Sequence, residues 1–205
     1  LRVITQKDEN STPVYGIGML VDITASKEQI RQLKAEIRMD VFTGLLNKTS
    51  IEKYGERKIT ELRGGEKLAS LILDMDDFKE INDRFGHPAG DYVLKQVAEI
   101  MRKDAPPGAR IGRIGGDEFN VLLVTDDLKA FDSYAKKLVK KVSEIKWNGS
   151  EIPVSCSVGI AWVSDPKQSY AKLYEMTDAA LYEAKRRGKN QMYSDLTAHA
   201  VQLEY

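Results

Sequence analysis

Residues 109–124, with the sequence Ala-Arg-Ile-Gly-Arg-Ile-Gly-Gly-Asp-Glu-Phe-Asn-Val-Leu-Leu-Val, predict a β-hairpin at the centre of the fold. Two β-rich runs meet at Gly115 and Gly116, and adjacent glycines can supply the positive φ angles of a two-residue hairpin turn. Asp117 and Glu118 follow at once, although carboxylates are poor strand formers and repel one another. Because successive strand side chains point to opposite faces, we expect these two carboxylates to have different roles.

A second acidic segment, Asp74-Met-Asp-Asp77, follows the apolar run 68–73, which is long enough to be a buried strand. A buried strand that delivers a carboxylate beside an acidic hairpin creates an all-oxygen cation site. Mg²⁺ prefers such a site, with one or two carboxylates, backbone oxygen and water, completed by substrate phosphates. Either segment alone is more simply interpreted as a solvated acidic turn, whereas the two together favour a functional cation site.

The remaining sequence predicts alternating helices and strands of the α+β class. The expected elements are a helix over 47–63 stopped by Gly64-Gly65, a strand over 68–74, a loop, a helix over 89–103, the central hairpin, a helix over 128–142, an Asn148-Gly149 turn, a strand over 152–163, a helix over 169–187 and a short strand over 190–194. The order β-α-β-β-α-β predicts a ferredoxin-like domain with a central antiparallel sheet, flanking helices and extra elements.

The N-terminal part of the chain predicts a short β-pair followed by a helix. Residues 1–24 contain two β-segments around a polar turn, and two strands cannot form an independent core. The helix that follows carries Ile30, Leu33 and Ile37 on one stripe. This pattern fits a solvated linker helix and a parallel coiled-coil connector equally well, because three apolar turns fall short of a sustained heptad run.

Composition limits the classes of partner. The 205 residues carry 31 basic and 31 acidic side chains, so no overall field draws the protein to nucleic acid or to an anionic membrane. The single cysteine, Cys156, cannot form an internal disulfide, and its alternating strand context predicts a small buried hydrophobe. No stretch resembles a membrane span or a signal peptide. We expect a cytoplasmic fragment without direct membrane contact, from a parent chain that can still carry a membrane anchor.

Six sequence blocks resemble the GGDEF family, the diguanylate cyclases, which condense two GTP molecules into cyclic di-GMP. Gly115-Gly-Asp-Glu-Phe119 matches the motif that names the family. The other blocks, in the family's order, are Asp40-Val-Phe-Thr-Gly-Leu-Leu-Asn47, Asp74-Met-Asp-Asp-Phe-Lys-Glu-Ile-Asn-Asp83, Phe85-Gly-His-Pro-Ala-Gly-Asp91, Ser157-Val-Gly-Ile160 and Asp178-Ala-Ala-Leu-Tyr-Glu-Ala-Lys185. The resemblance implies a palm-like catalytic domain over 41–205.

The same comparison implies the composition of the metal site. Asp74 and Asp117 would be ligands of Mg²⁺, with Mn²⁺ as the alternative ion, and the Met75 carbonyl would be a further ligand. Glu118 would either accept the proton of the attacking 3′-hydroxyl or assist a second ion, and the sequence does not separate these roles. Asp76 is expected to have a structural hydrogen-bonding role, and Asp77 to lie on the surface.

Three lysines are candidates for binding the triphosphate. Lys79 follows the strand in a loop that can turn backbone amides toward an anion. Lys185 and Lys189 lie at a basic helix end, where positive charge alone usually complements the helix dipole; the family block makes them phosphate ligands. The family usually has arginine at position 189, and lysine keeps the charge but loses the bidentate geometry.

The guanine base would be recognised by Asn82 and Asp91, because an amide and a carboxylate can pair with its N1–H, N2–H and O6 groups. The alternative is that both residues only cap turns or helices. By resemblance, Phe78, Phe42 and Leu94 would complete the GTP site, although the family usually has leucine at position 42.

The resemblance also concerns assembly and control. Asp40 and Arg113 would form an ion pair that ties the linker helix to the hairpin. The segment Pro106-Pro-Gly-Ala109 lacks the Arg-x-x-Asp of the family's inhibitory product site, so we expect no product inhibition there.

Catalysis would require a homodimer that presents each 3′-hydroxyl to the other subunit's α-phosphate. Residues 1–25 resemble the C-terminal strands of a PAS sensor, and residues 26–40 would be the linker from this upstream domain. The alternative function is a catalytically silent GTP-binding or protein-interaction module of the same fold.

Overall fold

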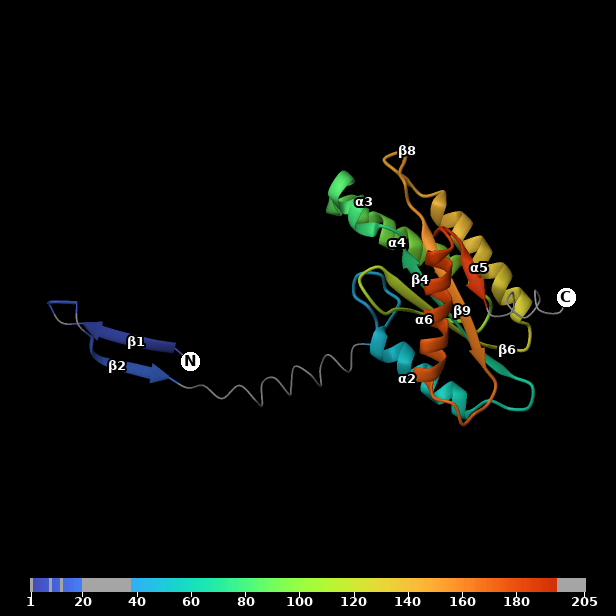
Figure 1. The fold of residues 1–205 in the computed structure, drawn as a ribbon, viewed down its shortest axis with the longest axis horizontal. Coiled ribbons are helices and arrows are strands. Elements are labelled where there is room, and N and C mark those ends of the chain that lie inside the picture. The colour runs from blue at the N-terminus through green and yellow to red at the C-terminus, as the bar shows by residue number, and fades with distance from the viewer. Residues whose placement is uncertain (1, 8, 12, 20–37, 195–205) are drawn as a thin grey trace. The chain divides into compact units, whose positions relative to one another are not determined.

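A computed structural model describes residues 2–7, 9–11, 13–19 and 38–194 (Figure 1). The chain divides into two compact units, Leu1–Ile37 and Arg38–Tyr205. In the first unit, β1 (Arg2–Lys7) pairs antiparallel with β2 (Pro13–Met19), as the polar turn between two β-segments predicts. The predicted linker helix falls mainly on residues 26–37, which lie outside the described residues.

The second unit contains the catalytic candidates. Its strands are β3 (Leu46–Asn47), β4 (Lys67–Met75), β5 (Arg110–Arg113), β6 (Glu118–Thr125), β7 (Lys146–Trp147), β8 (Ser150–Glu151), β9 (Cys156–Val163) and β10 (Met192–Ser194). Its helices are α2 (Lys48–Thr60), α3 (Phe78–Phe85), α4 (His87–Asp104), α5 (Leu128–Ser143) and α6 (Tyr170–Arg186). No helix in the described part of the chain is both long and apolar enough to cross a bilayer.

Among the described residues, six strands form one sheet in the order β10-β9-β4-β6-β5-β3. The four central strands are antiparallel neighbours, and β10 and β3 add parallel pairs at the two edges. The central order β9-β4-β6-β5 arises from the chain order β4-α4-β5-β6-α5-β9. The predicted ferredoxin-like α+β fold with a central antiparallel sheet is therefore confirmed.

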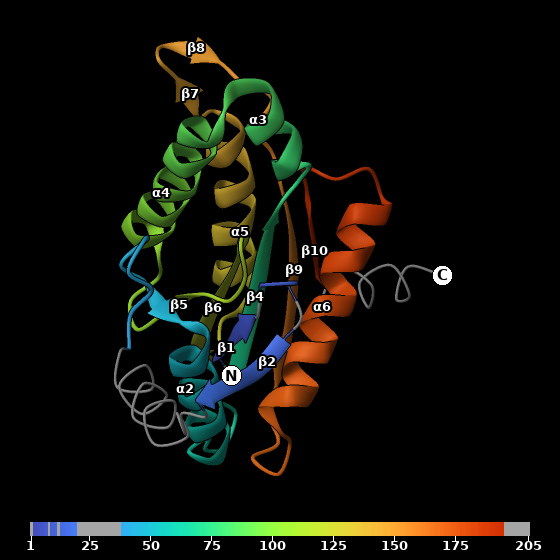
Figure 2. The same ribbon diagram turned by 90° about the vertical axis from the view of Figure 1, so that its left-hand side faces the viewer.

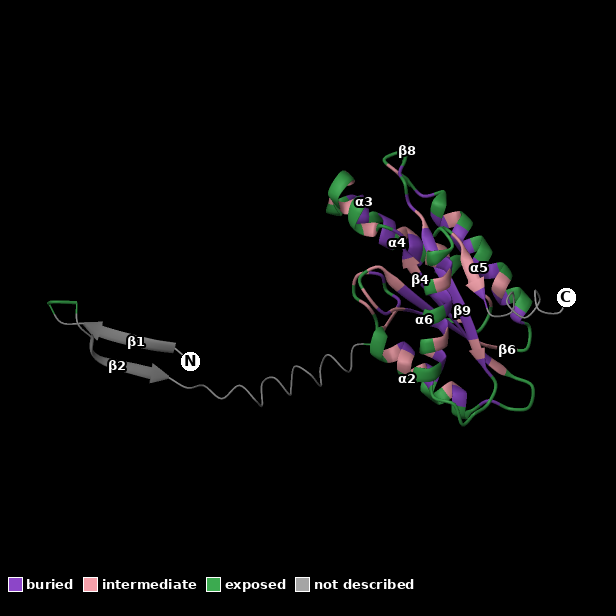
Figure 3. Ribbon diagram, viewed as in Figure 1, coloured by how far each residue is buried: buried purple, intermediate pink, exposed green. Residues whose placement is uncertain are grey.

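Helices cover both faces of the sheet, which explains why β4 is apolar along almost its whole length. Ala69, Leu71 and Leu73 point to one face and pack with buried residues of α4 and α5. Leu68 and Ile72 point to the other face and pack with buried residues of α2 and α6. Figure 2 shows α4 and α5 on one side of β4 and β9 and α6 on the other, and Figure 3 shows the buried residues concentrated between these layers.

Helix starts follow local capping chemistry. The side chains of Asn47, Asp127 and Ser169 each accept a hydrogen bond from the backbone N–H three residues later, at the starts of α2, α5 and α6. The predicted Asn148-Gly149 turn is also present, with φ angles of 51° and 79° that suit the tight hairpin joining β7 to β8.

Two predicted element boundaries are wrong. The loop expected after β4 contains the helix α3, because Phe78, Ile81 and Phe85 recur at helical spacing and pack against the α4 face of the core. The strand expected over 152–163 begins only at Cys156. Pro153 lacks the N–H that a ladder needs, although Ile152 and Val154 on either side of it are buried.

Candidate active site

The two acidic segments meet at one end of the sheet. In the register of the central strands, Asp74 at the end of β4 lies directly opposite Glu118 at the start of β6. The backbone N–H of Met75 donates to the carbonyl oxygen of Asp117 at 3.3 Å. The antiparallel pairing of two buried strands therefore brings Asp74 together with Asp117 and Glu118, which lie more than forty positions later in sequence.

The turn that carries Asp117 differs from the predicted one. Residues 114–117 form the connection, and neither Gly115 nor Gly116 has a positive φ, so the prediction of a two-residue turn is wrong. The N–H of Ile114 donates to the carbonyl of Glu118 at 2.9 Å and closes a wider loop. The glycine at position 115 leaves space for the Glu118 carboxylate, because a Cβ there would lie 2.5 Å from Glu118 Oε2 and would displace it.

The carboxylates are held at a high electrostatic cost. Burial raises the pKa of Glu118, and the charges of Asp74 and Asp117 raise it further. Burial likewise raises the pKa of Asp74, even though Lys185 Nζ lies 2.7 Å from Asp74 Oδ1 and opposes that shift. The site therefore concentrates negative charge that one lysine compensates only in part, and a divalent cation would relieve this repulsion.

The donor set fits a Mg²⁺ site that substrate completes. Within the described residues, no three Asp, Glu, His or Cys side chains gather closely enough to hold an ion by themselves. Two carboxylates, Asp74 and Asp117, with backbone oxygen such as that of Met75, form an all-oxygen set of the kind that Mg²⁺ shares with water and phosphates. Mn²⁺ accepts the same hard ligands.

A buried hydrogen-bond network lies directly behind these carboxylates. Asp76, only 4% exposed, accepts hydrogen bonds from Ser155 Oγ at 2.8 Å, Ser157 Oγ at 2.7 Å and the backbone N–H of Asn190 at 2.9 Å. Asp76 thus joins β4, β9 and the loop after α6. Sequence reasoning missed both serines, although the alternation Ser155-Cys-Ser157 already placed the two hydroxyls on one face.

The candidate phosphate ligands come from two segments that the structure connects. Lys79 is exposed in the first turn of α3. Lys189 donates to both carboxylate oxygens of Asp77, at 2.6 and 2.7 Å, so Asp77 is exposed as predicted but has a partner. Lys185 Nζ lies 2.7 Å from Asp74 Oδ1, one of the acidic-site carboxylates. All three ammonium groups come from elements that border the acidic end of β4.

The guanine candidates lie on the adjacent helices α3 and α4. Asn82 is half-buried on α3 and its Nδ2 donates to the Phe78 carbonyl at 3.4 Å, while Asp91 on α4 is exposed. Phe78 is half-buried against the core. Leu94 is only 4% exposed and belongs to the core beneath α4.

The expected ion pair between Asp40 and Arg113 is present, with Arg113 Nη1 3.4 Å from Asp40 Oδ1. Arg113 also donates to the Gly116 carbonyl at 2.6 and 3.1 Å, so it holds the hairpin loop itself. Burial acts to raise the pKa of Asp40, but hydrogen bonds from Thr43 and the charge of Arg113 outweigh it and lower the pKa. Two cations lie over the Phe42 ring, with Lys95 Nζ 4.9 Å and Arg113 Cζ 5.0 Å from its centroid.

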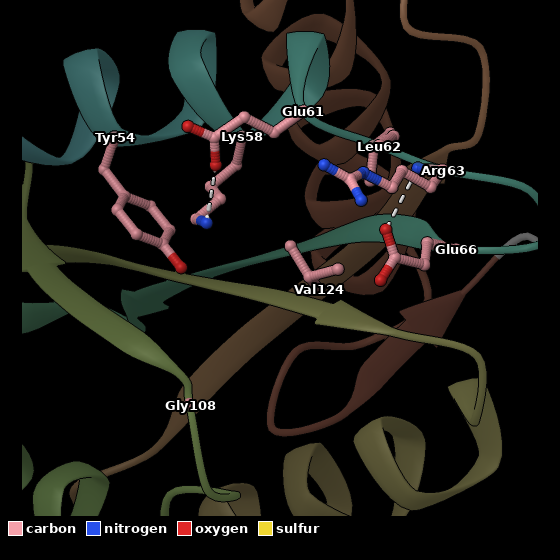
Figure 4. A pocket seen from close by; sticks show the side chains of 8 residues that line it. All are labelled: Tyr54, Lys58, Glu61, Leu62, Arg63, Glu66, Gly108 and Val124. Carbon is pink, nitrogen blue, oxygen red and sulfur yellow. Dashed lines mark hydrogen bonds and ion pairs between the residues drawn. The ribbon is translucent and has the colours of Figure 1, made fainter.

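A cavity of about 460 Å³ lies at the opposite end of β4 and β6 from these carboxylates (Figure 4). Its charged side chains are largely satisfied by one another, since Lys58 pairs with Glu61 at 2.7 Å and Glu66 accepts from the Arg63 backbone at 3.0 Å. Val124 at its floor is six residues along β6 from Glu118, about 20 Å away at strand rise. It is therefore separate from the site built around Asp74.

Comparison with known proteins identifies relatives of this chain. Residues 37–191 match the family model described as "Diguanylate cyclase, GGDEF domain". The chain is 35% identical over 175 residues to diguanylate cyclase DosC of Escherichia coli, covering 83% of this chain and 38% of DosC. It is 32% identical over 163 residues to diguanylate cyclase DgcS of Shewanella oneidensis, covering 79% of this chain and 54% of DgcS. The chain thus spans only part of these relatives.

Solved structures give the same result. The coiled coil and GGDEF domain of DgcB from Caulobacter crescentus, in complex with c-di-GMP, superposes with a TM-score of 0.72 at 27% identity, covering 84% of this chain and 93% of that one. Diguanylate cyclase SiaD of Pseudomonas aeruginosa, in complex with its activator SiaC, superposes with a TM-score of 0.71 at 29% identity, covering 83% of this chain and 66% of that one.

Proposed function

The chain belongs to the GGDEF family of diguanylate cyclases, and from that premise we propose that it condenses two GTP into cyclic di-GMP with release of pyrophosphate. The observation that carries this proposal is the placement of Asp74 directly opposite Glu118, with Asp117 beside them, at one end of the sheet. Such a charged cluster is costly for folding, and a function in binding cation and phosphate accounts for its presence.

In the proposed reaction, the 3′-oxygen of one GTP attacks the α-phosphorus of the other. The new O–P bond forms as the bond to the bridging oxygen of pyrophosphate breaks, and the 3′-hydroxyl proton goes to Glu118. The same step with the roles of the two nucleotides exchanged closes the ring, so each cyclic di-GMP releases two pyrophosphates. Asp74, Asp117 and the Met75 carbonyl would hold Mg²⁺, which would neutralise charge on the α-phosphate and acidify the hydroxyl. Lys79, Lys185 and Lys189 would bind the triphosphate. Lys185 can exchange its contact with Asp74 for a phosphate oxygen by rotation of its side chain.

Two subunits are needed because each active site would supply one half of the cyclic product. We therefore propose a two-fold homodimer, with residues 26–40 as the helical linker from a PAS-like sensor whose last strands are residues 1–25. The β1–β2 hairpin supports this assignment.

Separation of the nucleotides formed from GTP and Mg²⁺ tests the proposed cyclase activity. Cyclic di-GMP and pyrophosphate support it, whereas GTP binding without pyrophosphate release identifies the silent module.

Guanine selectivity gives a first prediction. Asp91→Asn should lower kcat/KM for GTP about 10- to 100-fold, because it replaces a charged acceptor that two guanine N–H donors would share. Initial rates with GTP, measured alongside Asp83→Asn, check this. Asp83 is an exposed carboxylate on α3, so its substitution makes the same charge change near the site. Equal rates for the two variants would exclude Asp91 as the guanine ligand.

Coupling of the linker to the hairpin gives a second prediction. Arg113→Glu should lower turnover about 100-fold, because the Gly116 carbonyl loses both donors and the loop that carries Asp117 shifts. Amide hydrogen exchange should quicken at Asp40 and Gly44, whose N–H groups close the adjoining turn. Arg110→Glu on the same strand is the matched control, since Arg110 contacts Tyr54 instead. Unchanged turnover and exchange in Arg113→Glu would contradict the coupling.

A further inference from the structure

Gly90 lies inside α4, where glycine is the least favourable helix residue after proline. The backbone does not require it, because Gly90 is outside the set of residues with positive φ. The residue is also buried. A buried glycine that weakens its own helix indicates that something else needs the space a side chain would take.

The space next to Gly90 is filled by two candidate GTP ligands. A Cβ at Gly90 would lie 2.1 Å from Asn82 Oδ1, 2.9 Å from Asn82 Cγ and 3.1 Å from Phe78 Cζ. The first two separations are shorter than real contacts. On its other side, the Asn82 amide donates to the Phe78 carbonyl of its own helix. The amide is therefore held between the backbone of α3 and the bare Cα of Gly90.

A methyl group at position 90 would displace the Asn82 side chain more easily than the helices. The backbone of α4 is anchored next to Gly90 by Ala89 and Val93, both 0% exposed, and α3 is anchored by Ile81, 2% exposed. The helices are also joined by the hydrogen bond from the Gly86 N–H to the Asn82 carbonyl at 2.9 Å. The amide, in contrast, is the end of a side chain that can rotate.

We propose that Gly90 is a positioning residue that determines nucleotide specificity, since its missing side chain lets the Asn82 amide take the orientation that reads guanine. This rests on the proposed function, in which Asn82 on α3 and Asp91, the residue after Gly90 on α4, pair with the base. Both ligands are then set by one short segment of α4: Asp91 directly, and Asn82 through the close approach of Gly90. Phe78 Cζ would lie 3.1 Å from a Cβ at Gly90, so its ring needs to move by only a few tenths of an ångström and the main effect falls on Asn82.

The test is a double-substitution cycle read by equilibrium binding of GTP and ATP in the presence of Mg²⁺. Gly90→Ala should raise the Kd for GTP at least about tenfold and narrow the preference over ATP, with kcat at saturating GTP within about threefold of wild type. Asn82→Ala should show a similar loss. Adding Gly90→Ala to Asn82→Ala should change the Kd less than twofold, because the displaced amide is already absent.

Thermal unfolding without nucleotide separates positioning from packing. Gly90→Ala should unfold at or above the wild-type midpoint, because alanine favours the helix. Three results would each overturn the proposal. Gly90→Ala could bind GTP with wild-type affinity, or it could weaken GTP binding as much in the Asn82→Ala background as in wild type. The third such result is a melting midpoint of Gly90→Ala below that of wild type. Binding is measured independently of turnover. A wild-type chain that binds GTP but makes no product would therefore reject the cyclase function and leave this test valid.

Discussion

Glu118→Gln is expected to lower kcat by about 10²–10⁴-fold, the usual contribution of a group that transfers a proton in the transition state. Gln is nearly isosteric with Glu, so the hairpin loop and the contact with Gly115 should persist. The Kd for GTP should change little, because Glu118 is not among the proposed base or phosphate ligands. Initial rates and equilibrium binding of GTP, compared with wild type, give the two quantities.

The same variant separates the proposed proton-accepting role of Glu118 from the alternative that the sequence leaves open, a ligand of a second ion. If Glu118 accepts the 3′-hydroxyl proton, raising Mg²⁺ or Mn²⁺ should not recover the lost rate. If it is a ligand of a second ion, a higher metal concentration should recover part of that rate. Turnover of Glu118→Gln within a few-fold of wild type at all metal concentrations would exclude both roles.

The Glu118→Gln substitution should raise thermal stability while it lowers activity. The pKa of Glu118 is raised in the folded state by burial and by the charges of Asp74 and Asp117, so folding is disfavoured when this carboxyl is ionised. In metal-free buffer, Glu118→Gln should therefore unfold at a higher temperature than wild type at pH values above the raised pKa. The gain should vanish below the ordinary pKa of glutamate, where wild type is protonated in both states. Thermal melts of both proteins across pH measure the gain in stability, which initial rates set against the loss of activity.

Asp76→Ala is expected to lower the free energy of unfolding by about 3 kcal/mol, because a buried donor left without an acceptor costs about 1–3 kcal/mol. The substitution removes the shared acceptor of Ser155, Ser157 and the Asn190 N–H. Turnover should fall with it, since the loop that carries Lys189 loses its anchor to β4. Urea denaturation and initial rates provide the two measurements.

Asp77→Asn is the control for this prediction, because asparagine removes the charge and still tolerates the φ of 50° at this position. Asp77 is the adjacent carboxylate, but it is exposed and its ion pair with Lys189 is open to solvent. Such pairs contribute about 0–1 kcal/mol, so its loss should be small. Equal destabilisation by the two substitutions would show that the buried network around Asp76 contributes no more than a surface ion pair.

Much of the architecture could be predicted because it depends on patterns local in sequence. The apolar run 68–73 becomes the central strand β4, and helical periodicity placed α5 and α6 within one residue of their observed ends. Local pattern was insufficient for α3, because its eight residues are too few to form a stable helix without tertiary packing. The helix α3 is stabilised by packing of Phe78, Ile81 and Phe85 against a core formed by distant residues.

The sequence by itself determined the family, most of the order of helices and strands along the chain and the residue types of the site, because motif identity and hydrophobic alternation are properties of contiguous residues. Only the tertiary structure decided that Asp74 faces Glu118, that Gly115 provides space rather than a positive φ, and that Asp76 joins three segments. It also decided that the Asn82 side chain fills the space beside Gly90. These features depend on distances between residues that are separate in sequence, and such distances are set when the sheet and helices pack.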